Sequence, residues 1–335
     1  MQVKIHAHAA MARAEELKPW TYDAEGPTPQ EVIVEVESCG VCWSDVDMID
    51  NNRGLSNYPL VPGHEVVGRV VETGTEVHGP KKGDRVGIGW WRGACLECEM
   101  CLSGRENLCS ERKATIVNGY GGFADHIVVD SHFAYRWPEN LDPIKGAPLL
   151  CAGHAVFGAL TTAGMTSRQE IGIIGFGGLG HIAVQFAAAQ GNRVTVFTHS
   201  DDKANAAVSL GAHEVVVVKP GETPKVRKPL NILLTTAPAN LNFNEYLDLL
   251  APDGVLAFSS KPPKPIELDV NRLMGWRRRM LGNPTGGRSM MVQMLAAADR
   301  YGIEPIVETF PMAQANEAIA KIRANTIRHR GVLIA

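Results

Sequence analysis

IGIIGFGGLGHIAVQFAAAQG, residues 171–191, is the most informative stretch of the sequence. It starts as an apolar strand, passes through a Gly-x-Gly-x-x-Gly turn at 175–180, and continues with the apolar spacing of a helix until Gly191. Glycines at such a turn let the backbone approach a pyrophosphate, which the N-terminus of the following helix attracts. The turn therefore predicts a dinucleotide site, the alternative being a glycine-rich turn that only packs. Its predicted binding residues are Gly175, Gly177, Gly178, Leu179 and Gly180.

The alternation of strand and helix continues after this turn. Further apolar segments have the composition of buried strands, and helical patterns separate them. These segments are RVTVF (193–197), HEVVVV (213–218), NILLTT (231–236) and GVLAFS (254–259). The alternation is typical of a doubly wound parallel sheet in an α/β fold. Residues 1–150 differ, because strand patterns such as VIVEVE at 32–37 dominate there, so we expect a second, mainly β domain.

The composition is that of an ordinary globular protein of 335 residues, with 45% hydrophobic and 21% charged residues. Its 33 Lys and Arg against 36 Asp and Glu give a net charge of −3, so the chain lacks the basic excess of a nucleic-acid-binding protein. Its apolar runs are well below the ~20 residues of a membrane span. Glu15 and Glu16 stand where a secretory signal needs apolar residues. We expect a cytoplasmic protein that binds neither nucleic acid nor membrane.

The segment after the strand RVTVF indicates which dinucleotide binds. An NAD site usually carries an acidic residue about 20 residues after the glycines, but Thr198 stands at this strand end. Hydroxyls and cations suit the 2′-phosphate of NADP instead. The segment offers Thr198, His199, Ser200 and Lys203 for this contact. Asp201 and Asp202 favour the opposite unless they point outward, and the alternative is that these polar residues only cap the next helix.

Four of the seven cysteines fall on one short segment with the spacing C-x2-C-x2-C-x7-C. They are Cys95, Cys98, Cys101 and Cys109. In a reducing compartment, clustered cysteines bind metal more often than they form disulfides, and four thiolates suit tetrahedral zinc. An iron–sulfur cluster is one alternative, although the ferredoxin pattern closes with x3-Cys-Pro, whereas here the gap is seven residues and Ser110 follows. Unmetallated surface thiols are the other. A closed four-thiolate site predicts a structural zinc.

A second set of metal-binding residue types is spread along the chain. Cys39 lies in SCGVCWSD, His64 in VPGHEVVG and Cys151 in PLLCAG. Two cysteines and a histidine with an open fourth position form a catalytic zinc set. Glu65 is a candidate fourth ligand or electrostatic neighbour, Asp45 a candidate partner for the ring N–H of His64, and Ser44 a candidate proton relay. The alternatives are a cysteine that packs as a small hydrophobe and a histidine without metal.

These motifs together resemble the zinc-dependent medium-chain alcohol dehydrogenases over essentially the whole chain. The matching segments are CGVCWSD, YPLVPGHEVVGRV, GDRVGIGWWRGACLECEMCLSGRENLC, GGFADH, PLLCAG and IGIIGFGGLGHIAVQ. Within the family the sequence looks similar to the cinnamyl-alcohol-dehydrogenase-like branch. MIDNNRGLSNYPLVPGHEVVGRV and ETFPMAQANEAIAKIRA resemble the bacterial broad-specificity NADPH-dependent aldehyde reductases.

The resemblance implies a GroES-like catalytic domain at 1–150, a Rossmann domain at 151–283, and a return to the catalytic domain at 284–335. It implies reversible reduction of small aldehydes to alcohols with NADPH, and a homodimer or homotetramer. It also implies two zinc ions per chain: a catalytic ion on Cys39, His64 and Cys151, and a structural ion on the four clustered cysteines. Cys42 is then a packed thiol beside the active site.

The resemblance further implies that Trp90 and Ile49 line the substrate pocket. Many family members have histidine at the position of Asp47, where it ends a proton relay from the hydroxyl of Ser44. With aspartate there, the relay must run differently, for instance through a ribose hydroxyl and water. Two other functions stay open: an NAD-dependent alcohol or polyol dehydrogenase, and a non-catalytic member of the fold with zinc only at the four clustered cysteines.

Overall fold

The computed structural model describes residues 2–335, without the side chains of residues 2 and 202. The chain forms two compact units. One unit contains the chain up to Cys151 together with Gly287–Ala335, and the other contains Ala152–Gly286. After the functions predicted for them from the sequence, we call them the catalytic unit and the dinucleotide unit. No helix in the described part of the chain is long and apolar enough to span a membrane.

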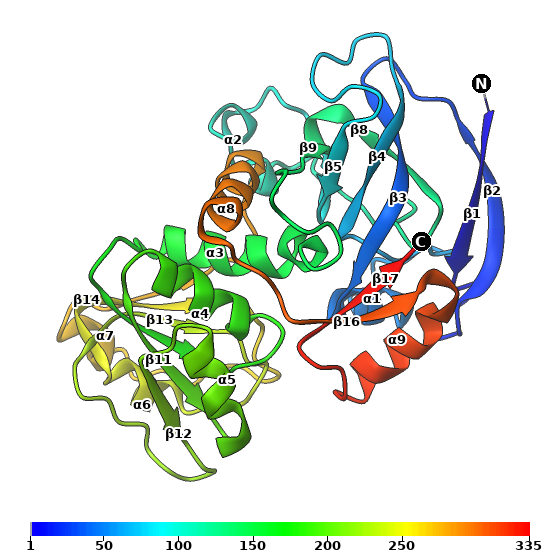
Figure 1. Ribbon diagram of the computed structural model, residues 1–335. Coiled ribbons are helices and arrows are strands. Elements are labelled where there is room, and N and C mark those ends of the chain that lie inside the picture. Colours follow the sequence, from blue (N-terminus) through cyan, green and yellow to red (C-terminus); the bar gives the residue numbers. More distant parts are fainter. Residues whose placement is uncertain (1) are drawn as a thin grey trace. The chain divides into compact units, whose positions relative to one another are not determined.

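The dinucleotide unit is built on a six-stranded sheet in the order β12-β11-β10-β13-β14-β15, and all neighbouring strands are parallel. The strands are β10 (Glu170–Ile174), β11 (Arg193–Thr198), β12 (Glu214–Val217), β13 (Leu230–Thr235), β14 (Leu250–Phe258) and β15 (Arg279–Gly282). The helices are α3 (Ala152–Thr162), α4 (Gly180–Ala189), η4 (Asp201–Lys203), α5 (Ala204–Ser209), α6 (Phe243–Leu247) and α7 (Asn271–Met274) (Figure 1). This doubly wound parallel sheet confirms the predicted α/β fold.

The strand order of this sheet reverses beside β10, where open α/β sheets usually bind their ligands. Central strands of a parallel sheet are covered on both faces, which explains the continuous apolar sequence of β10. Ile171, Ile173 and Ile174 are buried there. The glycine-rich turn follows β10 directly and leads into α4. The fold therefore presents this turn at the usual ligand-binding edge of the sheet.

The catalytic unit is built on a sheet in the order β16-β17-β3-β4-β5-β9, with β8 also paired to β3. Two further pairs, β1 with β2 and β6 with β7, form small separate sheets. The strands of the unit are β1 (Gln2–Ala9), β2 (Lys18–Glu25), β3 (Glu31–Val41), β4 (Val66–Thr73), β5 (Arg85–Ile88), β6 (Trp91–Gly93), β7 (Lys113–Ala114), β8 (His126–Asp130), β9 (Tyr135–Arg136), β16 (Val307–Pro311) and β17 (Arg330–Ile334). The helices are α1 (Trp43–Ile49), α2 (Glu99–Leu102), η1 (Glu106–Leu108), η2 (Ser131–Phe133), η3 (Ala147–Leu150), α8 (Arg288–Tyr301), η5 (Met312–Gln314) and α9 (Ala315–Arg323) (Figure 1).

The C-terminal segment completes this sheet. Strand β17 pairs antiparallel with β3, so that Gly331 lies opposite Val41 and Leu333 opposite Cys39. On the other side of β3, Cys39 lies opposite Val66 of β4. Strand β3 is therefore held from both sides, and the loop that follows it starts from a fixed position.

Candidate active site and metal centres

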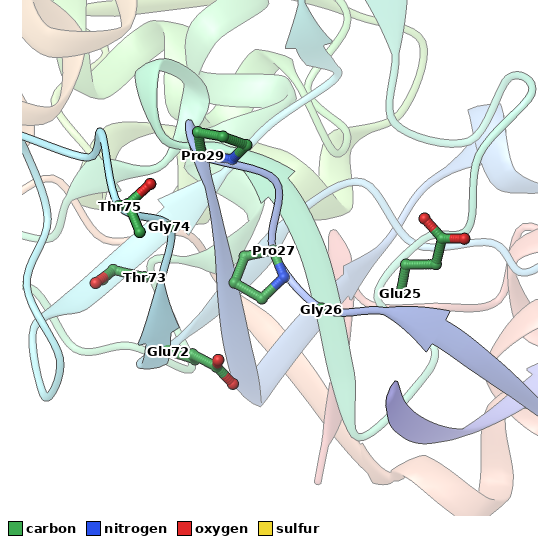
Figure 2. Close-up of a pocket in the computed structure, with 8 residues that line it drawn as sticks. All are labelled: Glu25, Gly26, Pro27, Pro29, Glu72, Thr73, Gly74 and Thr75. Carbon is green, nitrogen blue, oxygen red and sulfur yellow. The ribbon is translucent and has the colours of Figure 1, made fainter. Parts of the chain in front are cut away.

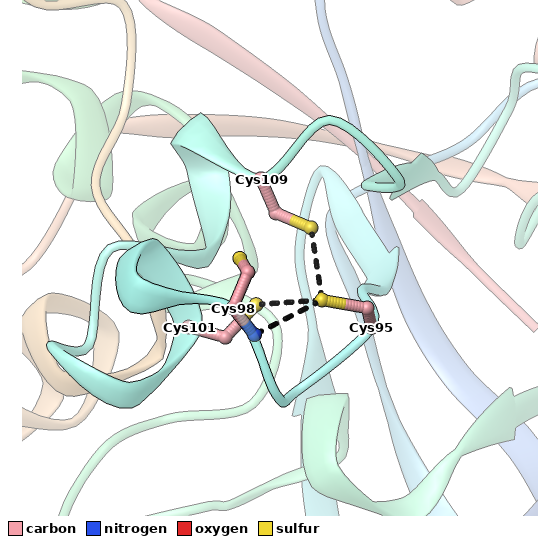
Figure 3. A group of neighbouring side chains, drawn as sticks. All are labelled: Cys95, Cys98, Cys101 and Cys109. Carbon is pink, nitrogen blue, oxygen red and sulfur yellow. Dashed lines mark hydrogen bonds between the residues drawn. The ribbon is translucent and has the colours of Figure 1, made fainter.

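The four-cysteine cluster consists of Cys95, Cys98, Cys101 and Cys109, whose sulfur atoms all lie within 4.8 Å of one another (Figure 3). The sulfur of Cys95 is 3.8 Å from that of Cys101 and 3.5 Å from that of Cys109. A tetrahedral ion with Zn–S bonds of ~2.3 Å requires S···S distances of roughly 3.8 Å. The cluster therefore has the dimensions of a four-thiolate metal centre.

The backbone around this cluster favours thiolates. The N–H of Cys98 donates to the sulfur of Cys95 at 3.4 Å, and the N–H of Glu111 donates to the sulfur of Cys109 at 3.3 Å. The hydrogen bond from the Cys95 backbone is the main reason why the pKa of Cys109 falls to about 7. Metal ligands must be deprotonated, so these contacts support metal binding.

The loop that carries the four-cysteine cluster is joined to α8 through Glu106. This carboxylate is buried, and it accepts a hydrogen bond of 2.9 Å from the backbone N–H of Arg288, the first residue of α8. The Arg288 side chain in turn donates to the carbonyl of His132 at 2.8 Å. The loop therefore connects segments of the catalytic unit that are far apart in the sequence.

A second cluster, the mixed cluster, consists of Cys42, His64, Glu65 and Cys151, with donor atoms within 4.8 Å of one another. Cys42 caps the N-terminus of α1, His64 and Glu65 precede β4, and Cys151 follows η3. The Nε2 of His64 is buried and has no hydrogen-bond partner within the described residues. A buried polar atom without a partner costs free energy, which a metal ion at this position would remove. The residues present therefore fit a metal.

The prediction of Cys39 as a ligand is wrong, because Cys42 occupies that place. Cys39 lies within strand β3, and its sulfur packs beneath Gly63 and Gly122 in the hydrophobic core. The chain turns after Val41, so Cys42 leaves the strand at the start of α1 and joins His64 and Cys151. The Sγ atoms of Cys42 and Cys151 are 4.0 Å apart. The interpretation of Cys42 as a merely packed thiol is wrong for the same reason.

Asp45 is hydrogen-bonded to two residues of the mixed cluster, Cys42 and His64. One carboxylate oxygen lies 3.0 Å from Nδ1 of His64 and accepts from the backbone N–H of Gly63 at 2.9 Å. The other accepts from the backbone N–H of Cys42 at 2.9 Å. Since Nδ1 of His64 is engaged by Asp45, Nε2 is the ring nitrogen that faces the other donors. Asp45 thus fixes two of the donor groups at once.

Arg330 is a buried cation at the mixed cluster that the sequence analysis did not identify. Its guanidinium is hydrogen-bonded to Glu65, and Nη1 lies 3.9 Å from the sulfur of Cys42. The hydrogen bond from Cys151, helped by the charge of Arg330, lowers the pKa of Cys42 well below its ordinary value, while the same hydrogen bond raises the pKa of Cys151. Burial raises the pKa of Glu65 to about 7 although Arg330 opposes this. Arg330 therefore balances the negative charge of the thiolate and carboxylate groups.

Ser44, Asp47 and Trp90 surround a second arginine, Arg53. The Nη2 of Arg53 donates to Oγ of Ser44 at 3.2 Å and to Asp47 at 3.0 Å. The ring of Trp90 meets the ring of His64 edge to face, with centroids 5.0 Å apart. Trp90 therefore lies against a residue of the mixed cluster, and Ser44 follows Cys42 by two positions in the sequence.

Ile49 was predicted to line the substrate pocket, but its side chain is buried in the hydrophobic core of the catalytic unit. Its carbonyl accepts a hydrogen bond of 2.8 Å from the Tyr58 hydroxyl. A hollow of about 670 Å³ elsewhere on this unit is lined by Glu25, Gly26, Pro27, Pro29, Glu72, Thr73, Gly74 and Thr75 (Figure 2). This hollow contains none of the predicted site residues.

The glycine-rich turn of the dinucleotide unit has the backbone geometry of a phosphate cradle. Gly175 has φ +92°, which a residue with a side chain rarely adopts. A Cβ at Gly177 would meet only open space, whereas a Cβ at Gly180 would lie 2.0 Å from the carbonyl oxygen of Gly175. The first glycine makes the turn, the second leaves room for a ligand, and the third permits close packing. Leu179 stands at the N-cap of α4.

The residues predicted to bind the 2′-phosphate follow β11. Thr198 ends this strand and is buried, with Oγ1 3.4 Å from the backbone N–H of Ser200. Ser200 precedes the short helix η4, which ends at Lys203. His199 lies between the two hydroxyl residues. All four residues are thus on one short turn at the end of the strand.

Comparisons with known proteins agree with this arrangement. Residues 28–139 match the alcohol dehydrogenase GroES-like domain, and residues 178–300 match the zinc-binding dehydrogenase family. The chain is 38% identical to the aldehyde reductase AdhA of Synechocystis over 98% of each chain. It is 38% identical to a mannitol dehydrogenase of Apium graveolens, over 99% of this chain and 93% of that one.

Solved structures agree as well. A cinnamyl alcohol dehydrogenase from Sorghum bicolor superimposes with a TM-score of 0.93 at 33% identity, covering 99% of this chain and 98% of that chain. CAD from Helicobacter pylori, solved in complex with NADP(H), gives a TM-score of 0.90 at 27% identity and covers 100% of this chain and 99% of that chain. The predicted GroES-like and Rossmann architecture is thereby confirmed. The chain belongs to the zinc-dependent medium-chain alcohol dehydrogenase family, as its motifs predicted.

Proposed function

We propose that this protein reversibly reduces small aldehydes to alcohols with NADPH, using zinc held by Cys42, His64 and Cys151. The observation that carries the proposal is the convergence of two cysteine sulfurs on the buried Nε2 of His64, which has no hydrogen-bond partner among the described residues. Two thiolates and an imidazole leave a fourth position open on zinc, as catalytic sites require. The relatives named as aldehyde reductase and cinnamyl alcohol dehydrogenase support the same reaction class.

The residues around the proposed zinc would each have a separate role in the reaction. Bound zinc would polarise the carbonyl as a Lewis acid, and bound nicotinamide would supply the hydride. Asp45 keeps the His64 ring in the orientation that directs Nε2 to the metal. Ser44 passes a proton to the oxygen of the product alcohol. Glu65 is hydrogen-bonded to Arg330, and its carboxylate is a further donor group beside the proposed metal.

The four-cysteine cluster would hold a second zinc ion with a structural role. All four ligands are thiols, and their distances leave no room for substrate on a tetrahedral ion. We therefore propose two zinc ions per chain. The proposal predicts about two equivalents of zinc by elemental analysis of the purified protein.

For the cofactor we propose NADPH, held by the glycine-rich turn and by Thr198, His199, Ser200 and Lys203. The alternative is NADH, which the missing acidic residue at the end of β11 disfavours. The Helicobacter pylori relative solved with NADP(H) supports this choice. We also propose that the protein is cytoplasmic and that it forms a homodimer or homotetramer. Light scattering during gel filtration tests the oligomeric state.

Thr198→Asp is expected to shift the preference of the enzyme from NADPH toward NADH. A carboxylate at the end of β11 would repel the 2′-phosphate and bind a ribose hydroxyl instead. We expect kcat/KM for NADPH to fall by about 10- to 100-fold, since repulsion of like charges at an interface is worth a few kcal/mol. Ser209→Asp, an exposed hydroxyl residue at the end of α5, adds the same charge elsewhere in this unit and serves as the control. An unchanged cofactor preference in Thr198→Asp would contradict the assignment.

The proposed function itself is tested with a panel of aldehydes and alcohols and both cofactors. Aldehyde-dependent NADPH oxidation, with NADH clearly slower, is the expected result. Preference for NADH with alcohols or polyols would favour an NAD-dependent dehydrogenase. About one zinc per chain together with no turnover would indicate a non-catalytic protein.

A further inference from the structure

We propose that Arg53 is a positioning residue that holds the hydroxyl of Ser44 in the orientation needed to donate its proton. The inference rests on the proposed function, in which Ser44 protonates the product. Arg53 lies in the turn after α1, nine residues beyond Ser44.

Three contacts fix the guanidinium of Arg53. Its Nε and Nη2 donate to the same carboxylate oxygen of Asp47, at 3.2 Å and 3.0 Å. Its Cζ lies over the ring of Trp90, 5.5 Å from the centroid. Trp90 itself packs edge to face against the metal-site residue His64. The position of Arg53 is therefore set by Asp47 on one side and by the aromatic neighbour of the mixed cluster on the other.

The held guanidinium determines what the Ser44 hydroxyl can do. Nη2 of Arg53 donates to Oγ of Ser44 at 3.2 Å, so this oxygen is an acceptor toward Arg53. The hydroxyl hydrogen must then point in another direction and is free to be donated there. Arg53 lies over Trp90, whose ring packs against His64, so the Ser44 hydroxyl that Arg53 holds is linked to the mixed cluster, and we infer that this direction includes a substrate bound there. Arg53 thus separates the accepting and donating sides of the hydroxyl.

Asp47 does not serve as the proton acceptor for Ser44 in this arrangement. Its Oδ2 accepts twice from Arg53, and its Oδ1 accepts from the side-chain amide of Asn52 at 3.3 Å. Asp47 therefore acts as an anchor for Arg53. A guanidinium does not release its own proton in proteins, so Arg53 cannot pass one on. It instead stabilises the negative charge that appears on Oγ of Ser44 during transfer.

The proton balance of the step is simple. In aldehyde reduction the O–H bond of Ser44 breaks and an O–H bond forms on the oxygen of the alcohol product. A proton from bulk solvent, passed on by water, then returns to Oγ of Ser44, so that one solvent proton is consumed for each hydride that NADPH would supply. In alcohol oxidation the same proton moves in the opposite direction, and no additional oxidant or reductant is involved.

The test compares Arg53→Ala with the control Arg277→Ala. Arg277 lies in the dinucleotide unit and, like Arg53, donates two hydrogen bonds to an aspartate, in this case Asp253. The side chain of Arg53 is 40% exposed, so its ion pair contributes little to stability and the variant should fold. We expect kcat for a neutral aldehyde such as benzaldehyde to fall by about 10-fold in Arg53→Ala, the effect of one lost charge-assisted hydrogen bond. The KM, the zinc content and Tm should stay near those of the wild type. Added methylguanidinium should restore part of kcat.

A double-mutant cycle with Ser44→Ala decides whether Arg53 acts through Ser44. If it does, Arg53→Ala has no further effect on kcat in the Ser44→Ala background. An equal loss in both backgrounds, or a change confined to KM, would overturn the proposal. An active wild type with unchanged kcat in Arg53→Ala also overturns it, while leaving the proposed function intact. A wild type without aldehyde-dependent NADPH oxidation refutes the proposed function, and the role of Arg53 with it.

Discussion

Cys42→Ala is expected to lower kcat for aldehyde reduction on the order of 1,000-fold or more. Cys42 supplies one of the donor atoms of the mixed cluster, and without it the metal loses a ligand. Removal of a single hydrogen-bond donor to a developing oxyanion already costs ~10²–10³ in kcat, and the metal stabilises that charge more directly. Elemental analysis should show zinc falling from about two to about one per chain, since the four-cysteine cluster is unaffected.

Cys39→Ala is the matched control, because it makes the same chemical change three residues away. Cys39 is fully buried in the core, and its sulfur is not among the converging donor atoms of Cys42, His64, Glu65 and Cys151. We expect a loss of roughly 1–2 kcal/mol in the free energy of unfolding from the small cavity, with kcat and zinc content retained. An inactive Cys39→Ala protein with an active Cys42→Ala protein would reverse the ligand assignment.

Cys98→Ala is expected to act on stability before it acts on catalysis. The cysteine caps α2 and belongs to the four-cysteine cluster, whose metal would tie α2 and η1 into one loop. Loss of a bound metal is among the changes with the largest effects on stability, and we expect roughly 3 kcal/mol or more. In a domain of this size that corresponds to a fall in Tm of about 6–12 °C, measured by calorimetry or fluorescence.

Leu102→Ala provides the comparison for that experiment. Leu102 lies on the same helix but its side chain is 77% exposed, so its removal should change Tm by little. Treatment of the wild type with a chelator that removes the second zinc should reproduce the Tm of Cys98→Ala. Equal Tm values for Cys98→Ala and the wild type would exclude a structural role for the cluster.

Local patterns were sufficient for part of this protein. The turn at 175–180 and the four-cysteine cluster are each contained in a short segment, so spacing alone defines their geometry. Cys39 and Cys42 could not be separated in this way, because they differ in whether the chain is still in β3 or has already turned into α1. Along a strand, successive side chains point to opposite faces, so the position at which the strand ends decides where each cysteine points. A signal was present in Asp45, which holds the backbone of Cys42 and the ring of His64 together.

The arginines could not be recognised from local patterns at all. Arg330 reaches Glu65 because β17 pairs with β3, a contact between segments at opposite ends of the sequence. Arg53 lies only nine residues from Ser44, but its proposed role also depends on Trp90. Trp90 lies in the distant segment between β5 and β6. Both contacts follow from tertiary structure, where propensity and periodicity carry no information.

The pairing of β17 with β3 has a consequence for synthesis on the ribosome. Once the ribosome has added Cys151, all residues of the mixed cluster have been synthesised. The strand that carries Arg330 emerges only after the whole dinucleotide unit has been made. The nascent catalytic unit must therefore wait with an open sheet edge, while Ala152–Gly286 can already fold as a continuous segment. A polypeptide released before β17 would expose that edge of β3 and leave Glu65 without its cation. Truncated translation products of this protein should accordingly aggregate instead of accumulating as a smaller active enzyme.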